Sequence, residues 1–202
     1  MAVITNYTTL KTEIAAWISR ADLTTAIPGL VQFAESRFNR TLRARQMETK
    51  AAFSITGEYV AAPAEFLEFR SGYTTTTPRT ALAFMPSDTL TDSFSSEGTG
   101  RPQYFCVEGS NFRFGPIPDA TYDATIVYYA AIPPLELNAT NWLLLAHPDL
   151  YLYGALLQGE GYIMDDPRLP LIKAAYDEGV AQLNNDSRKA RWGGNAMAAR
   201  AA

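Results

Sequence analysis

The chain has 202 residues, of which 47% are apolar and 19% charged, and its formal net charge is −4 at pH 7. This length and composition are typical of one globular domain that needs no disulfide or structural metal to fold. The acidic net charge argues against a protein that coats nucleic acid through its overall field. The single cysteine excludes an internal disulfide and any multi-cysteine zinc site.

Two helices are predicted at the N-terminus, because apolar residues recur there at intervals of three and four positions. The first helix runs from Asn6, its N-cap, to about Ala21. The second has Pro28 in its first turn and reaches about Gln46. Its predicted core face comprises Ile27, Leu30, Val31, Ala34, Phe38 and Leu42. Another face of the same helix is basic and carries Arg37, Arg40 and Arg43.

From Ala51 the apolar pattern changes to a period of two, which predicts strands. Strands on either side of Gly57 are expected to form one hairpin, and strands on either side of Gly109 a second. Between them, Ser87 is expected to cap a short helix. The longest predicted strand covers residues 122–131, which are rich in β-branched and aromatic residues.

Helical signals return in the last third of the chain. His147-Pro148-Asp149 opens a helix that is expected to reach about Ile163, since proline suits the first helical position. Asp165-Asp166-Pro167 opens another, expected to run to about Lys189. The segment 191–202 is rich in Gly and Ala and is expected to be a flexible tail when the chain is alone.

The order of these elements predicts an α+β fold, in which N- and C-terminal helices form a bundle that carries a central antiparallel β-rich insertion. We expect a single domain over residues 1–202. Its helical body comprises 1–50 and 136–190, its β-rich lobe 51–135, and its tail 191–202. The N-terminus shows no secretory signal pattern, and no apolar run has the length of a membrane helix, so a membrane partner is not expected.

A search for catalytic patterns finds no candidate nucleophile, cofactor motif or metal cluster, and no cofactor is expected. His147 is the only histidine, and its place before Pro148 favours a structural role at the start of a helix. Cys106 lies in an apolar run and is expected to be a small buried residue. The chain contains neither a P-loop nor a dinucleotide-binding glycine pattern, and no Gly-x-Ser-x-Gly elbow.

Paired carboxylates could in principle hydrolyse a glycosidic bond, so we considered each acidic pair. The pairs are Asp165 with Asp166, Asp177 with Glu178, and Glu65 with Glu68. None lies in an apolar setting that would separate the two pKa values, as acid–base catalysis requires. We therefore expect helix capping, turn and surface roles for these residues, and the chain is not expected to be an enzyme.

The segment from Arg37 to Lys50 is the most polarised part of the chain, with Arg40, Arg43 and Arg45 between them. One interpretation is a solvated helix face that pairs with acids such as Glu35 or Glu48. The other is a contact face for an acidic partner or for DNA phosphates. Aromatic residues that could stack on bases are missing from this face.

Several segments resemble, in the same order, those of the ring-forming head-to-tail adaptor (connector) proteins of tailed bacteriophages, most closely those of short-tailed phages. Individually these are weak packing and turn motifs, and together they extend over nearly the whole chain. One departs from the family pattern, with Ala62 in place of the usual Leu and Glu65 in place of Asp. The segments are 7–10, 27–30, 34–40, 62–68, 101–105, 112–118, 127–135, 141–144 and 148–156.

The resemblance implies a structural virion protein, made in the host cytoplasm and located at the head–tail junction. It implies a ring, typically of twelve copies, that binds the portal protein on one side and tail nozzle or tail fibre proteins on the other. DNA would pass through the channel without sequence-specific binding. The end of the last helix and the tail would dock on the portal, through Arg188, Arg191, Trp192, Met197 and Arg200. Candidate channel or partner contacts are Arg37, Arg40 and Arg43.

Two alternatives remain open at this point. One is a virion-associated peptidoglycan hydrolase that uses a carboxylate such as Asp165 or Glu178. The other is a small DNA-binding module that uses the arginines of the second helix.

Overall fold

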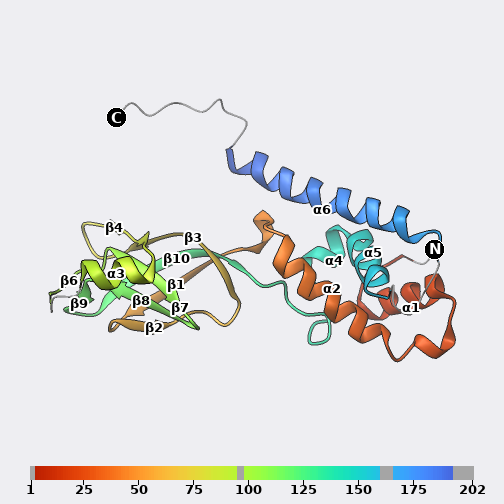
Figure 1. Ribbon diagram of the computed structural model, residues 1–202, viewed down its shortest axis with the longest axis horizontal. Helices are drawn as coiled ribbons and strands as arrows, with labels where there is room; N and C mark the ends of the chain where they lie inside the picture. Colours follow the sequence, from red (N-terminus) through yellow and green to blue (C-terminus); the bar gives the residue numbers. More distant parts are fainter. Residues whose placement is uncertain (1–2, 95–97, 160–165, 193–202) are drawn as a thin grey trace. The chain divides into compact units, whose positions relative to one another are not determined.

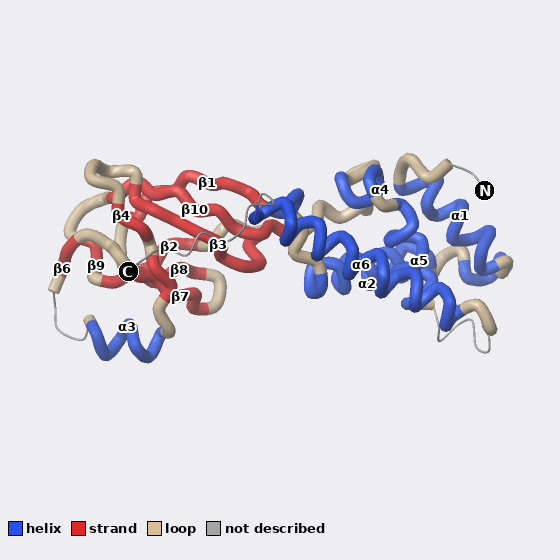
Figure 2. The backbone as a smooth tube through the Cα atoms, turned by 90° about the horizontal axis from the view of Figure 1, so that it is seen from above, coloured by secondary structure: helices blue, strands red, loops and turns tan. Residues whose placement is uncertain are grey.

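The computed structural model describes residues 3–94, 98–159 and 166–192. The chain folds into two compact units (Figure 1). One comprises residues 1–46 and 132–202 and the other residues 47–131. The first unit is helical, whereas the second is built of strands with a single helix in its described part (Figure 2). Helices therefore lie at both ends of the chain around an antiparallel β-rich middle, which confirms the predicted α+β class.

The helical unit contains five α-helices and a 3-10 turn in its described part, and a second 3-10 turn leads out of it. Helix α5 lies at its centre, because it contacts α1, α2, α4 and α6. These elements are α1 (Tyr7–Ile18), η1 (Ala21–Leu23), α2 (Ile27–Thr41), η2 (Arg45–Met47), α4 (Trp142–Ala146), α5 (Pro148–Gln158) and α6 (Leu169–Trp192).

Three aromatic residues from three helices form the middle of this core. The Phe38 ring on α2 lies 5.0 Å from that of Tyr151 on α5 and 6.2 Å from that of Tyr176 on α6. Gly154 on α5 makes this approach feasible, since a Cβ atom there would lie 2.9 Å from Phe38 Cζ. All six residues predicted for the core face of α2 are buried.

The two N-terminal helices end earlier than predicted. Helix α1 stops at Ile18, because Ser19 adopts the left-handed conformation (φ 53°) that ends many helices. Helix α2 stops at Thr41 instead of reaching Gln46, because Leu42 is extended (ψ 137°). Arg43 therefore lies beyond the helix and does not continue its basic face.

The C-terminal helices also depart from the prediction. Helix α5 ends at Gln158, short of the expected Ile163, and residues 160–165 lie outside the described part. Helix α6 begins at Leu169 and not at the acidic pair, since Asp166 Oδ1 accepts the backbone N–H of Arg168 in a turn before it (2.9 Å). Helix α4 was not predicted, although its N-cap is a favourable one: Asn141 Oδ1 accepts the N–H of Leu144.

The β unit contains two four-stranded sheets, ordered β1-β10-β3-β4 and β2-β8-β7-β5, and a small two-stranded one, β6-β9. All pairings are antiparallel except β5 with β7 and β6 with β9. The elements are β1 (Glu48–Ile55), β2 (Tyr59–Ala61), β3 (Phe66–Thr74), β4 (Thr80–Ala81), β5 (Ala83–Phe84), α3 (Ser87–Ser93), β6 (Thr99–Gly100), β7 (Tyr104–Glu108), β8 (Asn111–Gly115), β9 (Ile117–Pro118) and β10 (Tyr122–Ala130).

Aromatic side chains join the two larger sheets into one core. The Phe69 ring of β3 lies 4.3 Å from that of Phe105 on β7, and Phe66 packs edge-on against Phe112 on β8 at 5.0 Å. Cys106 is buried, as predicted. Because aromatic rings bury large apolar areas, these contacts between the two sheets stabilise the folded β unit.

One predicted hairpin is present and the other is wrong. Strands β7 and β8 pair through a turn in which Gly109 has a positive φ of 61°. The strands on either side of Gly57 do not pair with each other: β1 pairs with β10 and β2 with β8, so the chain changes sheets at Gly57. Ser87 begins α3 but does not cap it, because its hydroxyl donates to Glu108 Oε1.

Among the described residues, none of the helices combines the length and apolarity needed to cross a bilayer. The same residues contain no group of three or more His, Cys, Asp or Glu side chains that could hold a metal ion.

Candidate functional site

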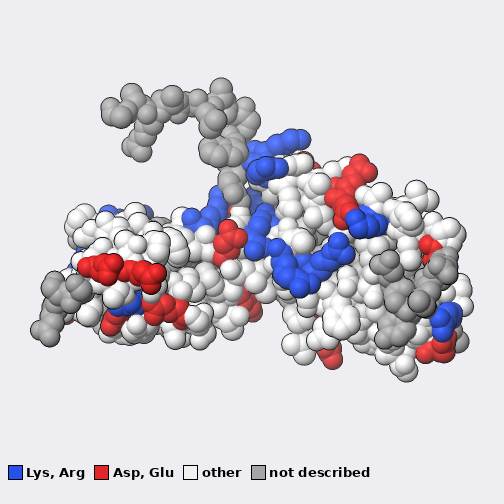
Figure 3. Space-filling model, in the orientation of Figure 1, with Lys and Arg blue, Asp and Glu red and all other residues white. Residues whose placement is uncertain are grey.

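Cationic side chains gather at one end of the helical unit, near the C-terminal ends of α2 and α6 (Figure 3). Side-chain hydrogen bonds from α6 bring these two ends together. Asn184 Oδ1 accepts the N–H of Arg43 (2.9 Å) and Ser187 Oγ that of Arg45 (3.1 Å). We call the resulting surface the basic end; it comprises Arg40, Arg43, Arg45, Arg188 and Lys189.

Two of the five cationic residues of the basic end have no charged partner in the described part of the chain. Arg40 and Arg45 are exposed, and within the described part of the chain their side chains form no hydrogen bond or ion pair. The Asp186 carboxylate, which is also exposed, lies 3.9 Å from Lys189 Nζ. Exposed pairs of this kind contribute little binding energy, so the surface attracts anionic groups of a partner.

Arg43 uses part of its side chain to complete the end of α2. Its Nη1 donates to the carbonyl oxygens of Asn39 (3.0 Å) and Leu42 (2.6 Å). Carbonyl groups in the last turn of a helix lack partners within the helix, and a guanidinium satisfies them well. Arg43 thus has a structural role at this surface.

A cleft of about 220 Å³ lies beside the basic end and contains the only histidine of the chain. His147 separates α4 from α5, as its place before Pro148 predicted, and its side chain caps neither helix. The cleft brings no second imidazole or thiol to it. Its lining residues are Arg45, Gln46, His147, Leu183, Asp186, Ser187 and Ala190.

The arginines predicted as channel or partner contacts, Arg37, Arg40 and Arg43, do not form one surface. Arg37 is half-buried: its guanidinium lies 4.7 Å from the Tyr176 ring and 3.9 Å from the Asp177 carboxylate. It therefore holds α6 against α2. Arg40 is exposed in the last turn of α2, and Arg43 follows the helix. Of the three, only Arg40 has a guanidinium without a partner in the described part.

The residues predicted for portal binding lie at and beyond the end of α6. Arg188 is exposed, and its guanidinium bonds Asn185 one turn earlier. Arg191 and Trp192 are the last two residues of the helix. Met197 and Arg200 lie outside the described residues.

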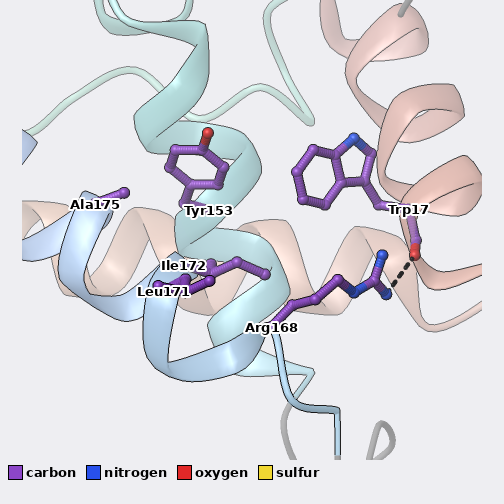
Figure 4. A pocket seen from close by; sticks show the side chains of 6 residues that line it. All are labelled: Trp17, Tyr153, Arg168, Leu171, Ile172 and Ala175. Atoms are coloured by element: carbon purple, nitrogen blue, oxygen red, sulfur yellow. Dashed lines mark hydrogen bonds between the residues drawn. The ribbon is translucent and has the colours of Figure 1, made fainter.

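An aromatic pocket of about 320 Å³ opens between α1, α5 and the first turns of α6 (Figure 4). The rings of Trp17 and Tyr153 meet edge to face at 6.1 Å. Arg168 Nη2 donates to the carbonyl oxygen of Trp17 (3.2 Å), and its guanidinium lies 6.0 Å from the indole. Leu171 is 74% exposed at this pocket. Tryptophan, tyrosine and arginine are the residue types most enriched in protein-binding hot spots.

Three of the carboxylates that were weighed as hydrolytic candidates, Asp166, Asp177 and Glu178, have structural partners, whereas Asp165 lies outside the described residues. Arg168 forms an ion pair with Asp166 (2.7 Å), and its hydrogen bond holds the pKa of that carboxyl below the usual range. Asp177 binds Lys173 (3.0 Å), and Glu178 accepts a hydrogen bond from Gln182. An acid that stays ionised beside an arginine is unsuited to donate a proton to a leaving group.

The most buried carboxylate among the described residues is Glu35, which one of the two interpretations of the basic segment gave as an ion-pair partner on a solvated helix face. Glu35 is only 6% exposed, and its Oε1 accepts the N–H of Leu135 (2.8 Å) and the hydroxyl of Tyr151 (3.3 Å). Burial raises the pKa of this carboxyl, and the nearby charge of Glu136 raises it further. The signal was present in the sequence, because Glu35 is four residues after Val31 and so shares its face of the helix.

Glu35 lies in an acidic groove of about 330 Å³ on the outside of the helical unit. Glu136 forms no hydrogen bond or ion pair within the described part of the chain. The pKa of Tyr7 is raised by burial and then by the charges of Glu136 and Glu35, so all three side chains share a negative field. The groove is lined by Tyr7, Pro28, Val31, Gln32, Glu35, Pro134, Glu136 and Leu137.

The described surface thus offers two charged sites and an aromatic pocket, but no set of residues with the geometry of an active site. Comparison with curated proteins finds no match. A comparison with protein-family models gives one match, to the SU10 adaptor protein model, over residues 5–200. Since the match extends over nearly the entire length, this chain belongs to the SU10 adaptor family, a family of bacteriophage adaptor proteins.

Proposed function

We propose that this protein is a head-to-tail adaptor that forms a ring beneath the portal, joins capsid to tail and surrounds the path of the DNA. The observation that carries this proposal is the family match over residues 5–200. The surfaces of the helical unit support it, since an assembly protein needs exposed charged and aromatic sites that only neighbouring chains complete. The most direct location for such a protein is the virion head–tail junction, after synthesis in the host cytoplasm.

Helix α6 and the residues that follow it are our candidates for the portal contact. The helix has 24 residues and is therefore about 36 Å long. Asn184 and Ser187 fix it to the backbone at Arg43 and Arg45, so its last turn is held in a defined place on the helical unit. From there, Arg188, Arg191, Trp192, Met197 and Arg200 would reach the portal, while the β unit would bind tail nozzle or tail fibre proteins.

A ring of about twelve copies, as the earlier resemblance implies, would give the DNA a channel without sequence-specific contacts. The net charge of −4 per copy supports passage without tight binding, because phosphates are repelled by a wall of like charge. Arg40 is the one predicted channel residue whose side chain is exposed and unpaired in the described part. Following the resemblance, we propose that the protein acts in a phage with a short tail.

Co-assembly with the portal protein of the same phage tests the proposal. We expect electron microscopy of the mixture to show adaptor rings bound to the portal. The number of adaptor copies per portal subunit should be the same in every particle. A chain that lacks residues 193–202 should fold but be recovered in fewer portal complexes. Replacement of the same residues by a Gly-Ser segment of equal length is the control for chain length. Equal recovery of the deletion variant would refute the part of the portal contact that we assign to residues 193–202.

We also propose that the chain has no hydrolase activity of its own. The pairing of Asp166 with Arg168 and of Asp177 with Lys173 supports this, because it gives both carboxylates structural roles. A zymogram on bacterial cell wall should show no clearing by the purified protein. Clearing that is lost in Asp165→Asn or Glu178→Gln would overturn the proposal in favour of a virion-associated peptidoglycan hydrolase.

A further inference from the structure

Helix α2 lines the acidic groove with its first half and carries an exposed arginine in its last turn. Pro28 and Val31 in its first turns line the acidic groove, whereas Arg40 lies in its last turn. A helix rises about 1.5 Å per residue, so Pro28 and Arg40 are about 18 Å apart along the axis. Arg45 extends the basic surface beyond the end of the helix.

The acidic groove has the chemistry of a site for an arginine or lysine side chain. Two acidic residues line it: Glu35, whose carboxylate is buried, and Glu136, whose carboxylate has no partner in the described residues. Its walls are apolar, from Pro28, Val31 and Pro134, and they would pack on the methylene stem of a long cationic side chain. The Lys11 ammonium is directed to the ring of Tyr7 instead, 4.4 Å from its centroid. In the described part of the chain, the Lys11 ammonium forms no ion pair with Glu35 or Glu136.

Within the described part of one chain, neither Glu35 nor Glu136 forms an ion pair with the basic end. Glu35 and Arg40 are five positions apart on the same helix, which at 3.6 residues per turn places them about 140° apart around its axis. Because the acidic groove and Arg40 lie on different faces of α2, the groove of one copy can attract the arginine of another copy. Such a contact uses two different patches and is therefore head-to-tail, and a head-to-tail contact closes into a ring when its rotation permits.

We propose that the acidic groove of one copy receives Arg40 or Arg45 from the basic end of the next copy. This inference rests on the proposed ring and specifies which surfaces build it. Charge complementarity favours a second copy over another occupant, because the same chain supplies the carboxylate groove and the unpaired guanidinium groups. Leu137, which is 82% exposed at the groove, would be covered in the contact.

Charge reversal and its compensation test the contact. Glu136→Arg and Arg40→Glu should each lower the yield of rings on the portal at least tenfold, since like charges then face each other. The double variant Glu136→Arg/Arg40→Glu should recover much of that yield, because every interface in a ring contains one residue of each kind. Glu178→Arg, an exposed reversal on α6 outside both surfaces, is the matched control and should assemble like the wild type.

A cysteine pair gives an independent readout of geometry. In Glu136→Cys/Arg40→Cys, oxidation should produce a ladder of covalent oligomers, because each copy links to two neighbours. Either single cysteine variant should give no ladder. A product that stops at the dimer would indicate a symmetric contact instead and would overturn the head-to-tail arrangement. Native Cys106 is buried and serves as the unreacted background.

The outcomes separate this inference from the proposed function. If the wild type forms rings and both single reversals do so equally well, the contact is wrong and the adaptor function stands. If Arg40→Glu alone is defective, or if it only weakens DNA retention in a mobility-shift assay, the basic end binds the portal or DNA, and the inference is overturned. If the wild type forms no ring with the portal, the proposed function itself fails.

Discussion

Tyr151 and Glu35 meet in the interior of the helical unit, where the Tyr151 hydroxyl lies 3.3 Å from Glu35 Oε1 although the residues are 116 positions apart. The same hydroxyl accepts a hydrogen bond from Asn141 Nδ2 (2.6 Å), and Asn141 also donates to the carbonyl of Pro133 (2.8 Å). Together with the bond from Leu135 to Glu35, these contacts attach the segment before α4 to helices α2 and α5. One hydroxyl therefore connects three parts of the chain.

Tyr151→Phe should lower the free energy of unfolding by about 1–3 kcal/mol, because it leaves a buried carboxylate and a buried amide each short of a partner. Denaturant unfolding of the purified chain measures the change. Tyr153→Phe is the matched control on the same helix: its hydroxyl forms no hydrogen bond in the described part, so the change should be under about 0.5 kcal/mol. Equal effects of the two variants would show that the network adds nothing.

The ionisation of Glu35 should make the stability of the helical unit depend on pH. Burial raises the pKa of this carboxyl above its ordinary value of 4.5. A group whose pKa is raised on folding contributes stability that is fully present below the unfolded-state pKa and is lost as pH rises through the folded-state pKa. Relative to Glu35→Gln, the wild type should therefore lose stability as pH increases from 4 to 8.

For Asp166, the stability of the protein should depend on pH in the opposite direction. Its hydrogen bond with Arg168 lowers the pKa of the carboxyl, so its contribution is present above the unfolded-state pKa and is lost as pH falls through the folded-state value. Relative to Asp166→Asn, the wild type should lose stability on acidification below the ordinary pKa of 3.8. If both variants change in the same direction with pH, the environments assigned to the two carboxylates are wrong.

Two glycines should respond to alanine in opposite ways. Gly154→Ala should destabilise the protein by about 1–3 kcal/mol through overpacking, because the new methyl would lie 2.9 Å from Phe38 Cζ and 3.3 Å from Tyr176 Cε2. Gly29→Ala in α2 meets no atom within 4 Å and should stabilise by about 0.5–1 kcal/mol through helix propensity. Thermal or denaturant unfolding of both variants checks the pair, and a stabilised Gly154→Ala would contradict the packing described.

Local patterns in the sequence predicted the elements that depend on local interactions. The buried face of α2, including Leu30 and Phe38, follows from helical periodicity, and the β7–β8 hairpin follows from Gly109 between two apolar runs. The chain around Gly57 shows the limit of this reasoning. A glycine between two strands predicts a hairpin, but here the strands pair with β10 and β8, whose residues lie fifty or more positions away.

The candidate sites were less predictable, because they depend on which distant segments meet. The arginines of the basic end are visible in the sequence, but no local pattern places Arg45 beside Ser187. Glu35 enters the sequence analysis only as a possible partner of the basic helix face, although its spacing from Val31 indicates the core side. The acidic groove needs Glu136 from a segment a hundred residues later, and only the fold brings the two carboxylates together.

The junction between α6 and the end of α2 should depend on a single amide side chain. Asn184 replaces the hydrogen-bond partners that the backbone loses where α2 ends: its Oδ1 accepts the N–H of Arg43, and its Nδ2 donates to the carbonyl of Thr41 (3.1 Å). Asn184→Ala removes both bonds and should cost about 1–2 kcal/mol. Hydrogen exchange at the Arg43 and Arg45 amides should accelerate, because the C-terminal part of α6 would then open locally.

Asn185→Ala is the control for that variant, since it makes the same chemical change at the next position of the same helix. The Asn185 side chain bonds only Arg188, on its own helix, so the exchange of the Arg43 amide should stay at its wild-type rate. Both variants gain the same helix propensity, and the difference between them therefore isolates the contact with α2. If this contact also positions the end of α6 for the portal, Asn184→Ala should lower portal recovery while Asn185→Ala does not. Equal exchange rates in the two variants would show that α6 is held at this end by its apolar contacts, such as Leu183, and not by the amide.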